Sequence, residues 1–312
     1  MDFLIPAGSA TNLPKEIVDE IAKLATEKAV LLKLLDNRNR FIEVVNEGTI
    51  PAIGAFDLDK FFRTEGTDDI TSLTEASFTI QHPDLKPQEI GAYTYLKKKQ
   101  IEQYRKLDLE KLFKNGLADG IARAIEKLIL VGQYSSSPGT DYLKIADGIV
   151  TIAEDSSKCA LSPITYTESK SQAVADAVMD ALVDLGAYAD DEEINNLLLI
   201  CSPDFYAAAQ KSADRDIVGF ELDVVPELGK GKRPLIHGIP LLKRSAITGE
   251  KAILVNLKSL FVGYYGKIQV EADYKVERSA YLYVIKFWVD FKVGTINSSG
   301  KAEGLIEIKK YS

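Results

Sequence analysis

The residues of this sequence that could carry chemistry are few and lie far apart. The segment Gly229–Lys232 contains two glycine–lysine pairs, which resemble part of a phosphate-binding loop. The full motif, G-x-x-x-x-G-K-[ST], is absent and no helix is expected to follow, although such loops bind phosphate at the start of a helix. A basic surface turn is the simpler interpretation. The alternative that this segment keeps open is an α+β enzyme that binds a phosphorylated small molecule.

The other nucleophiles and metal ligands form no catalytic pattern. The two histidines, His82 and His237, have no Cys, His or carboxylate neighbours at metal-ligand spacing. Cys159 and Cys201 lack a C-x-x-C arrangement, and Ser202 lacks the G-x-S-x-G elbow of a nucleophilic serine. The sequence therefore predicts no catalytic residue, no cofactor-binding residue, no metal site and no enzyme activity.

The composition places the chain among soluble globular proteins. Its 312 residues are 46% hydrophobic and 27% charged, with a net charge of −8. No run approaches the ~18 apolar residues of a membrane-spanning helix, and the N-terminus lacks the basic and apolar regions of a signal peptide. Two cysteines form no disulfide framework, which favours an intracellular setting. The negative charge argues against gripping nucleic acid, yet it is compatible with a wall that faces nucleic acid without holding it.

One long amphipathic helix is predicted at residues 107–132, and it is the element around which the rest is organised. Asp108 is a plausible N-cap and Gly132 a plausible stop. Each glycine inside a helix costs about 1 kcal/mol relative to alanine, so small residues there suggest that another backbone approaches closely. The candidate close-packing positions lie four residues apart on one flank: Gly116, Gly120 and Ala124. The alternative is a core helix that tolerates its glycines.

A projecting β-arm is predicted before this helix. Residues 54–77 have little periodicity and alternate in charge, whereas residues 78–82 and 86–95 have the pattern of two paired strands. The arm has too few apolar residues for its own core, and a two-stranded arm is only marginally stable alone. We therefore expect it to rest on a neighbouring subunit, although any single residue could equally belong to a solvated loop. The candidate inter-subunit contacts are Phe56, Lys60, Phe61, Phe62, Arg63 and Glu65.

The remaining elements mix helices and strands without a βα repeat, which predicts an α+β fold. Helices are expected at residues 15–35, 167–185 and 205–211, the last capped by Ser202 or Asp204. The continuous apolar run at residues 197–201 is typical of a strand buried on both faces. Further strands are expected at these positions: 41–53, 252–255, 268–274 and 280–293.

This order of elements resembles the HK97-type major capsid fold of tailed bacteriophages and their relatives. The resemblance rests on residues 55–66, 77–80 and 85–96 as the extended β-hairpin loop and on residues 108–132 as the spine helix. It continues through Ile200–Pro203 and Gly238–Leu241 into the strands at 281–305. The implied division is an N-terminal arm and first helix (1–40), an extended hairpin or E-loop (41–102), a peripheral domain with the spine helix (103–164), an axial domain (165–260) and a C-terminal return to the peripheral domain (261–312).

The resemblance implies a structural protein of the virion. A major capsid protein of this family self-assembles into pentamers, with or without hexamers, of an icosahedral shell that encloses double-stranded DNA. The implied partners are the chain itself, portal, scaffolding and decoration proteins, and packaged DNA contacted weakly and non-specifically. No cofactor and no membrane are implied, and the shell would assemble in the host cytoplasm.

Two departures from the family pattern qualify this expectation. Residues 97–100 are more basic than the usual lead-in to the spine helix, and the internal scaffolding segment that would precede the arm is missing. Since the chain begins at Met1, we expect that a separate scaffolding protein assists assembly or that none is needed. The closest alternative is an encapsulin, a nanocompartment shell protein of the same fold that encloses a protein cargo instead of DNA.

Overall fold

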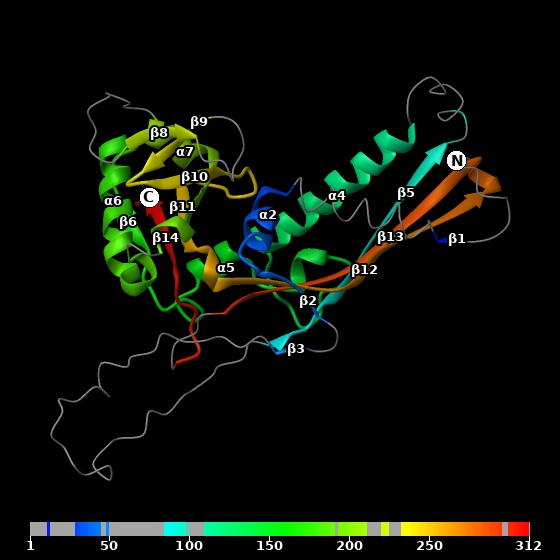
Figure 1. Ribbon diagram of the computed structural model, residues 1–312, viewed down its shortest axis with the longest axis horizontal. Coiled ribbons are helices and arrows are strands. Elements are labelled where there is room, and N and C mark those ends of the chain that lie inside the picture. Colours follow the sequence, from blue (N-terminus) through cyan, green and yellow to red (C-terminus); the bar gives the residue numbers. More distant parts are fainter. Residues whose placement is uncertain are drawn as a thin grey trace, which may run out of the picture.

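Two β-sheets joined around one long helix form the framework of the chain (Figure 1). The computed structural model describes residues 11–12, 29–44, 48–49, 84–97, 99, 109–190, 193–210, 220–224, 232–294 and 299–311. A five-stranded sheet, here called the spine sheet, runs beneath the long helix, and a seven-stranded sheet, the axial sheet, forms the body at the other end. No helix in the described part of the chain is long and apolar enough to cross a membrane.

The spine sheet is built on three long antiparallel strands, β5 (Gln88–Lys97), β12 (Leu260–Lys275) and β13 (Ala280–Val293). Two short strands, β1 (Thr11–Asn12) and β2 (Phe41–Glu43), pair with β12. Alternate residues of β13 are buried in the main core because they face the helix: Tyr283, Ile285, Phe287, Val289, Phe291 and Val293. The turn between β12 and β13 contains the short helix η7 (Val276–Arg278).

The helix that covers this sheet is α4 (Leu109–Val131), within two residues of the predicted range. Its buried stripe includes Leu117, Ile121 and Leu128. Gly132 follows the helix directly, as predicted, but its backbone is not left-handed, so it is not the expected C-cap glycine. A Cβ on Gly132 would overlap the Ala146 carbonyl oxygen and lie 2.7 Å from that of Leu128. This glycine is therefore needed where the chain turns through η2 (Tyr142–Lys144) into α5 (Ile149–Glu154).

The axial sheet has the order β6-β14-β11-β7-β10-β9-β8. Its strands are β6 (Ile164–Tyr166), β14 (Leu305–Lys310), β11 (Lys251–Asn256), β7 (Leu197–Cys201), β10 (Ile239–Lys243), β9 (Lys232–Ile236) and β8 (Phe220–Val224). All five residues of β7 are buried, as predicted, because both faces of the sheet are covered. Helices α6 (Ser171–Leu185) and α7 (Pro203–Gln210) pack on one face, and the core shared with α4, α5 and α2 (Val30–Asp36) covers the other.

Short helices connect these elements. Helices η3 (Gly186–Ala189) and η4 (Ile194–Asn196) lead from α6 to β7, and η6 (Leu257–Ser259) carries the chain from the axial sheet into the spine sheet. Of the predicted first helix at 15–35, the described part is α2. The predicted strand at 41–53 is represented by β2 and by β3 (Gly48–Thr49), and β12 begins well before the predicted residue 268.

The C-terminal strand corrects one sequence expectation. Residues 261–312 were expected to return together to the peripheral domain, and β12 and β13 do lie beneath α4. Strand β14, however, lies inside the axial sheet between β6 and β11. The physical reason is that Leu305, Ile306 and Ile308 are apolar on both faces of the strand, so they need a sheet that is covered on both sides.

Candidate functional site at the base of the hairpin

The predicted arm is closed at its base by a two-stranded sheet. Strand β3 pairs in antiparallel fashion with β4 (Asp84–Leu85), so that Gly48 faces Leu85 and Thr49 faces Asp84. The two strands that flank residues 50–83 therefore lie side by side. The predicted contact residues, namely Phe56, Lys60, Phe61, Phe62, Arg63 and Glu65, fall within this segment and lie outside the described residues. Strand β5 pairs with β13, a partner that the sequence did not indicate.

Leu85 fixes the base against the sheet by close packing. It is fully buried, at 0% exposure, in a small cluster with Val44 and Phe261. The side chain lies on Gly263 of β12, where an added Cβ would be 2.6 Å from Leu85 Cδ1 and 3.1 Å from Val44 Cγ2. The Arg40 guanidinium lies 4.5 Å from the centre of the Phe261 ring. The cluster covers the face of the spine sheet opposite α4, as the position of β3 in Figure 1 shows.

Asp290 fixes the direction in which the chain enters β5. The β5–β13 ladder ends at Gln88 and Val289, and the next residue of β13 is Asp290. Its carboxylate accepts one hydrogen bond from the backbone N–H of Lys86 and another from that of Phe291, both at 2.8 Å. The side chain thus takes the place of the next rung of the ladder. Burial raises the pKa of Asp290, which is only 4% exposed, against the opposing effect of these two hydrogen bonds.

The same face of the spine sheet carries aromatic side chains beyond the hairpin base. Tyr93 is 72% exposed and meets Tyr95 edge-to-face at a ring separation of 6.1 Å. Tyr265 and Trp288 form a second edge-to-face pair at 6.5 Å. The register places all four rings on the side of the sheet that bears Asp290, because each lies an even number of residues from it or opposite such a residue. We call this surface the outer aromatic face.

The small residues predicted on the spine helix do not meet another part of the described subunit. A Cβ built on Gly116 or Gly120 lies more than 4 Å from every described neighbour, and both glycines are exposed. Ala124 is half-buried against the main core. The hairpin base packs on Gly263 instead. One close approach within the subunit occurs at Gly148, whose Cβ would lie 2.6 Å from the Gly132 nitrogen.

Only weak signals in the sequence point to the residues at the base. Asp290 continues the outward-facing positions of a regular alternating strand, so periodicity does not distinguish it. A distinguishing signal is its type, since Asp is depleted from strands and a buried one needs a specific partner. Gly263 interrupts a β-rich run, which indicates close approach of another group. Neither signal identifies Leu85 or Lys86, which are distant in the sequence.

The described groups considered for chemistry have structural roles, and His82 lies outside the described residues. His237 lies in the tight turn between β9 and β10, with Nε2 3.0 Å from the carbonyl oxygen of Ala175. Both cysteines are buried and unpaired, and burial raises the pKa of Cys201 to about 12. Ser202 caps α7 as predicted, because its Oγ accepts the Phe205 N–H at 3.1 Å. Residues 229–231 lie outside the described part, and the segment that follows them is strand β9 instead of a phosphate-binding helix.

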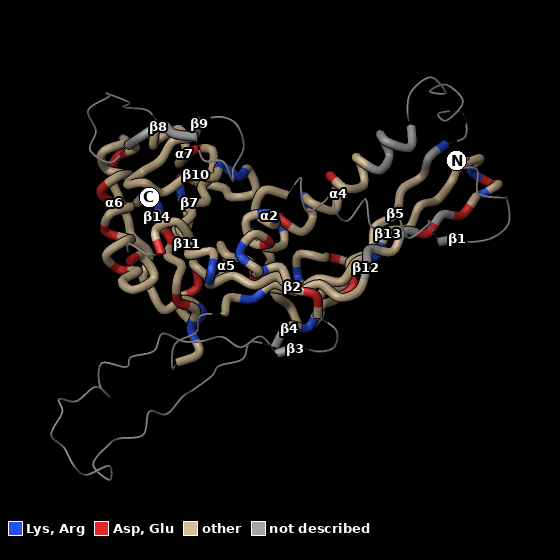
Figure 2. The backbone as a smooth tube through the Cα atoms, viewed as in Figure 1, with Lys and Arg blue, Asp and Glu red and all other residues tan. Residues whose placement is uncertain are grey.

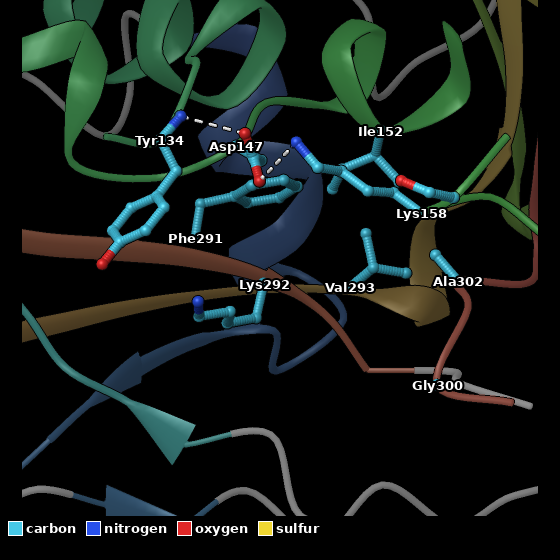
Figure 3. Close-up of a pocket in the computed structure, with 10 residues that line it drawn as sticks. Tyr134, Asp147, Ile152, Lys158, Phe291, Lys292, Val293, Gly300 and Ala302 are labelled. Atoms are coloured by element: carbon cyan, nitrogen blue, oxygen red, sulfur yellow. Dashed lines mark hydrogen bonds and ion pairs between the residues drawn. The ribbon is translucent and has the colours of Figure 1, made fainter. Parts of the chain in front are cut away.

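A cavity of about 270 Å³ lies between α5 and the end of β13 (Figure 3). Figure 3 shows Asp147 between Tyr134, whose N–H it accepts at 2.9 Å, and Lys158, whose ammonium lies 3.1 Å away. Phe291 and Val293 line the apolar wall. The Lys158 ammonium also lies 3.6 Å from the carboxylate of Asp155. Among the described residues, no group of His, Cys, Asp or Glu could hold a metal ion.

No protein-family model matches the sequence, and no curated protein matches it significantly. Solved structures do match along the chain. A chain of the satellite phage P4 procapsid, solved with its size determination (Sid) protein, is 13% identical, with a TM-score of 0.59 over 94% of this chain and 99% of that one. A capsid chain of an empty GTA particle is 16% identical, with a TM-score of 0.59 over 91% and 90%. A chain of Microbacterium phage Oxtober96 is 12% identical, with a TM-score of 0.57 over 100% and 95%.

These structural similarities establish the fold. The α+β chain, with its spine helix, hairpin base and axial sheet, has the HK97-type capsid fold that the sequence predicted. The similarity covers nearly the whole of each chain, so the architecture is shared as a unit.

Proposed function

We propose that this chain is a major capsid subunit that self-assembles into pentamers, with or without hexamers, of an icosahedral shell around double-stranded DNA. The observation that carries the proposal is the similarity to phage and GTA capsid chains over nearly the full length of both chains. A role as a structural protein of the virion, without enzymatic activity, agrees with this similarity. Assembly would take place in the host cytoplasm.

The hairpin is the part through which subunits would contact one another. Its base is held by Leu85 and Asp290, so the described strands on either side of residues 50–83 are fixed to the spine sheet. In the proposed shell, Phe56, Phe61 and Phe62 pack on the outer aromatic face of a neighbour, while Lys60, Arg63 and Glu65 pair with its charges. Glu89 and Glu271 flank the rings on that face and offer carboxylates to the basic residues.

The exposed flank of the spine helix is a second proposed contact. Because no described atom lies within 4 Å of a Cβ on Gly116 or Gly120, a backbone that approaches them closely would come from outside the described part of the subunit. Ala124, on the same flank, packs against the subunit's own core. We place the N-terminal arm or a neighbouring chain at this flank.

The charge distribution supports weak, non-specific contact with DNA. Figure 2 shows basic and acidic positions interspersed along the described chain. Many lysines already pair with carboxylates of their own subunit, among them Lys251 with Glu154 and Lys309 with Glu307. A protein that neutralises few phosphates binds DNA weakly, and dense DNA can then move along the wall. Portal, scaffolding and decoration proteins are further proposed partners.

Electron microscopy of the purified full-length chain tests the proposal. We expect closed shells or sheets, with or without a co-expressed scaffolding protein. Only small oligomers under both conditions would contradict a capsid function and favour the small-molecule enzyme. Particles isolated from the native source that enclose a cargo protein other than a scaffolding protein and no nucleic acid, identified by mass spectrometry and absorbance at 260 nm, would instead identify an encapsulin.

A matched pair of tyrosines tests the outer aromatic face. Tyr93→Ser should weaken assembly, because Tyr93 is 72% exposed at the centre of the proposed contact. Tyr311→Ser is the control, since Tyr311 is 69% exposed next to the last strand of the axial sheet. Equal particle yields from the two variants would exclude Tyr93 from a subunit contact.

A further inference from the structure

Helix α2 is buried more completely than a helix that packs on one surface. Four of its seven residues, Leu31, Leu32, Leu34 and Leu35, are at most 2% exposed. At about 100° per residue these positions span about 160° of the helix surface, whereas an ordinary amphipathic helix buries a stripe of roughly 100°. The leucines belong to one core with residues of α4 and of the axial sheet. Figure 1 shows α2 between the C-terminal half of α4 and the axial body.

The position of α2 coincides with the point where the two sheets join. Helix η6 carries the chain from β11 of the axial sheet into β12 of the spine sheet, and α2 contacts η6, β2 and β12. A rigid body wedged at such a junction limits how far the two sheets can rotate relative to each other.

The N-terminal end of α2 is held by a residue of the spine helix. Ala29, at the N-cap position, has no side chain that can accept a hydrogen bond. Instead Oε1 of Glu126 on α4 accepts the N–H of Leu31 at 2.9 Å. The same oxygen accepts a second hydrogen bond, at 3.1 Å, from Nη2 of Arg244 in the axial body. The side chain of Glu126 is 15% exposed and that of Arg244 22%, so water screens this contact less than a surface ion pair.

The C-terminal end of α2 is held by the axial body. The Arg38 guanidinium donates from Nη1 to the carbonyl of Leu34 in α2 at 3.1 Å. It also donates from Nη2 to the carbonyl of Asn195 at 2.9 Å and from Nε to Oδ1 of Asn196 at 3.1 Å. The wedge is therefore tied at one end to the spine helix and at the other to η4 of the axial body.

We propose that α2 sets the angle between the spine and axial sheets, and that Glu126 is the positioning residue that locks it. This inference rests on the proposed function for its consequence, which is that the locked angle sets the curvature of the shell. In a closed shell of identical subunits, each kind of contact closes only at a narrow set of rotations. A subunit whose two sheets rotate relative to each other would present its contacts at a range of angles, and shells of several sizes would form.

Glu126→Ala and Glu126→Gln test the lock in the full-length chain. The alanine removes the shared acceptor, and the glutamine keeps an oxygen at the same position. Lys127→Ala is the matched control, because Lys127 is the exposed neighbour on the same helix. For Glu126→Ala we expect hydrogen exchange at the Leu31 amide to become about tenfold faster. Particle diameters measured by electron microscopy should broaden or shift for the alanine and stay uniform for the glutamine and for the control.

Two readouts separate failure of this inference from failure of the proposed function. If the wild type forms no particles, the capsid proposal fails, and exchange at Leu31 together with small-angle scattering of the subunit still tests the wedge. Unchanged exchange and unchanged diameters in Glu126→Ala would overturn the inference. Should this variant not fold, Arg38→Ala releases the other end of α2 and must give the same broadened diameters, with Arg38→Lys as its conservative partner.

Discussion

Substitution of Gly263 by alanine tests the packing at the hairpin base. The added Cβ would lie 2.6 Å from Leu85 Cδ1 and 3.1 Å from Val44 Cγ2, whereas apolar carbons normally approach to about 3.5–4.0 Å. Leu85 must therefore move by about 1 Å, yet it is fully buried between Val44 and Phe261. Overpacking of this kind costs about 1–3 kcal/mol. We expect the cost to fall on the attachment of β4 to the sheet.

Hydrogen exchange at the Lys86 amide measures this cost directly, because that N–H is bonded to Asp290 only while the base is attached. A loss of 1–3 kcal/mol corresponds to exchange that is about 5- to 150-fold faster. Gly91→Ala is the matched control, since its Cβ would lie at an ordinary 3.9 Å from the Ile285 carbonyl oxygen on the same sheet. Equal exchange rates in the two variants would refute the packing argument.

A double variant identifies the atom that the new methyl group strikes. Leu85→Ala alone should also loosen the base, because burial of a leucine contributes about 1.5–3 kcal/mol. In Gly263→Ala/Leu85→Ala the clash with Leu85 is gone, so the stability lost in the double variant should be smaller than the sum of the two single losses. Strict additivity would show that Leu85 is not the group displaced.

Three further predictions concern residues elsewhere in the subunit. Burial raises the pKa of Asp290 above its unfolded value of about 3.9, so the folded state binds the proton more tightly than the unfolded state. The stability of the protein relative to Asp290→Asn should therefore rise as pH falls from 7 towards 4. A difference in melting temperature that does not depend on pH would contradict this. Gly120→Leu should leave the stability of the unassembled subunit unchanged or higher, because nothing described lies within 4 Å of a Cβ at this position. Thermal melts measure this stability, and electron microscopy measures particle formation. A loss of particles without a loss of stability would assign the flank to a contact with another chain. A thiol reagent at pH 8 should label neither Cys159 nor Cys201 in the native protein, because both are buried and burial raises their pKa values. Both should be labelled after unfolding. Stoichiometric labelling of the native state would contradict this.

Elements with a strong local pattern could be predicted from the sequence. Strand β13 occupies the predicted residues 280–293, because its alternation matches a sheet that is covered on one face by α4. The spine helix and the buried strand β7 were likewise predicted, since their patterns are long or continuous. The Ser202 cap was predictable because capping is a contact between residues three apart.

Contacts between distant residues could not be predicted in this way. The insertion of β14 into the axial sheet depends on which neighbours are free, and its apolar run fits any covered sheet. The glycines of the spine helix show the same limit. Their cost to the helix is visible in the sequence, but the backbone that uses the space is not. Within the described subunit the close approaches are at Gly132, Gly148, Gly263 and Gly294, which periodicity did not distinguish.

The two anchors of the subunit obey one physical rule. Where a helix or a ladder ends, its next N–H group lacks a partner, and the usual acceptor is a nearby side chain. Here the acceptors come from far along the chain: Glu126 is 95 residues from Leu31, and Asp290 is 204 residues from Lys86. Neither anchor can form until the spine helix and β13 are in place. The direction of the hairpin and the position of α2 are therefore fixed only in the completed fold, so a partly folded subunit would present neither feature in the geometry that assembly requires.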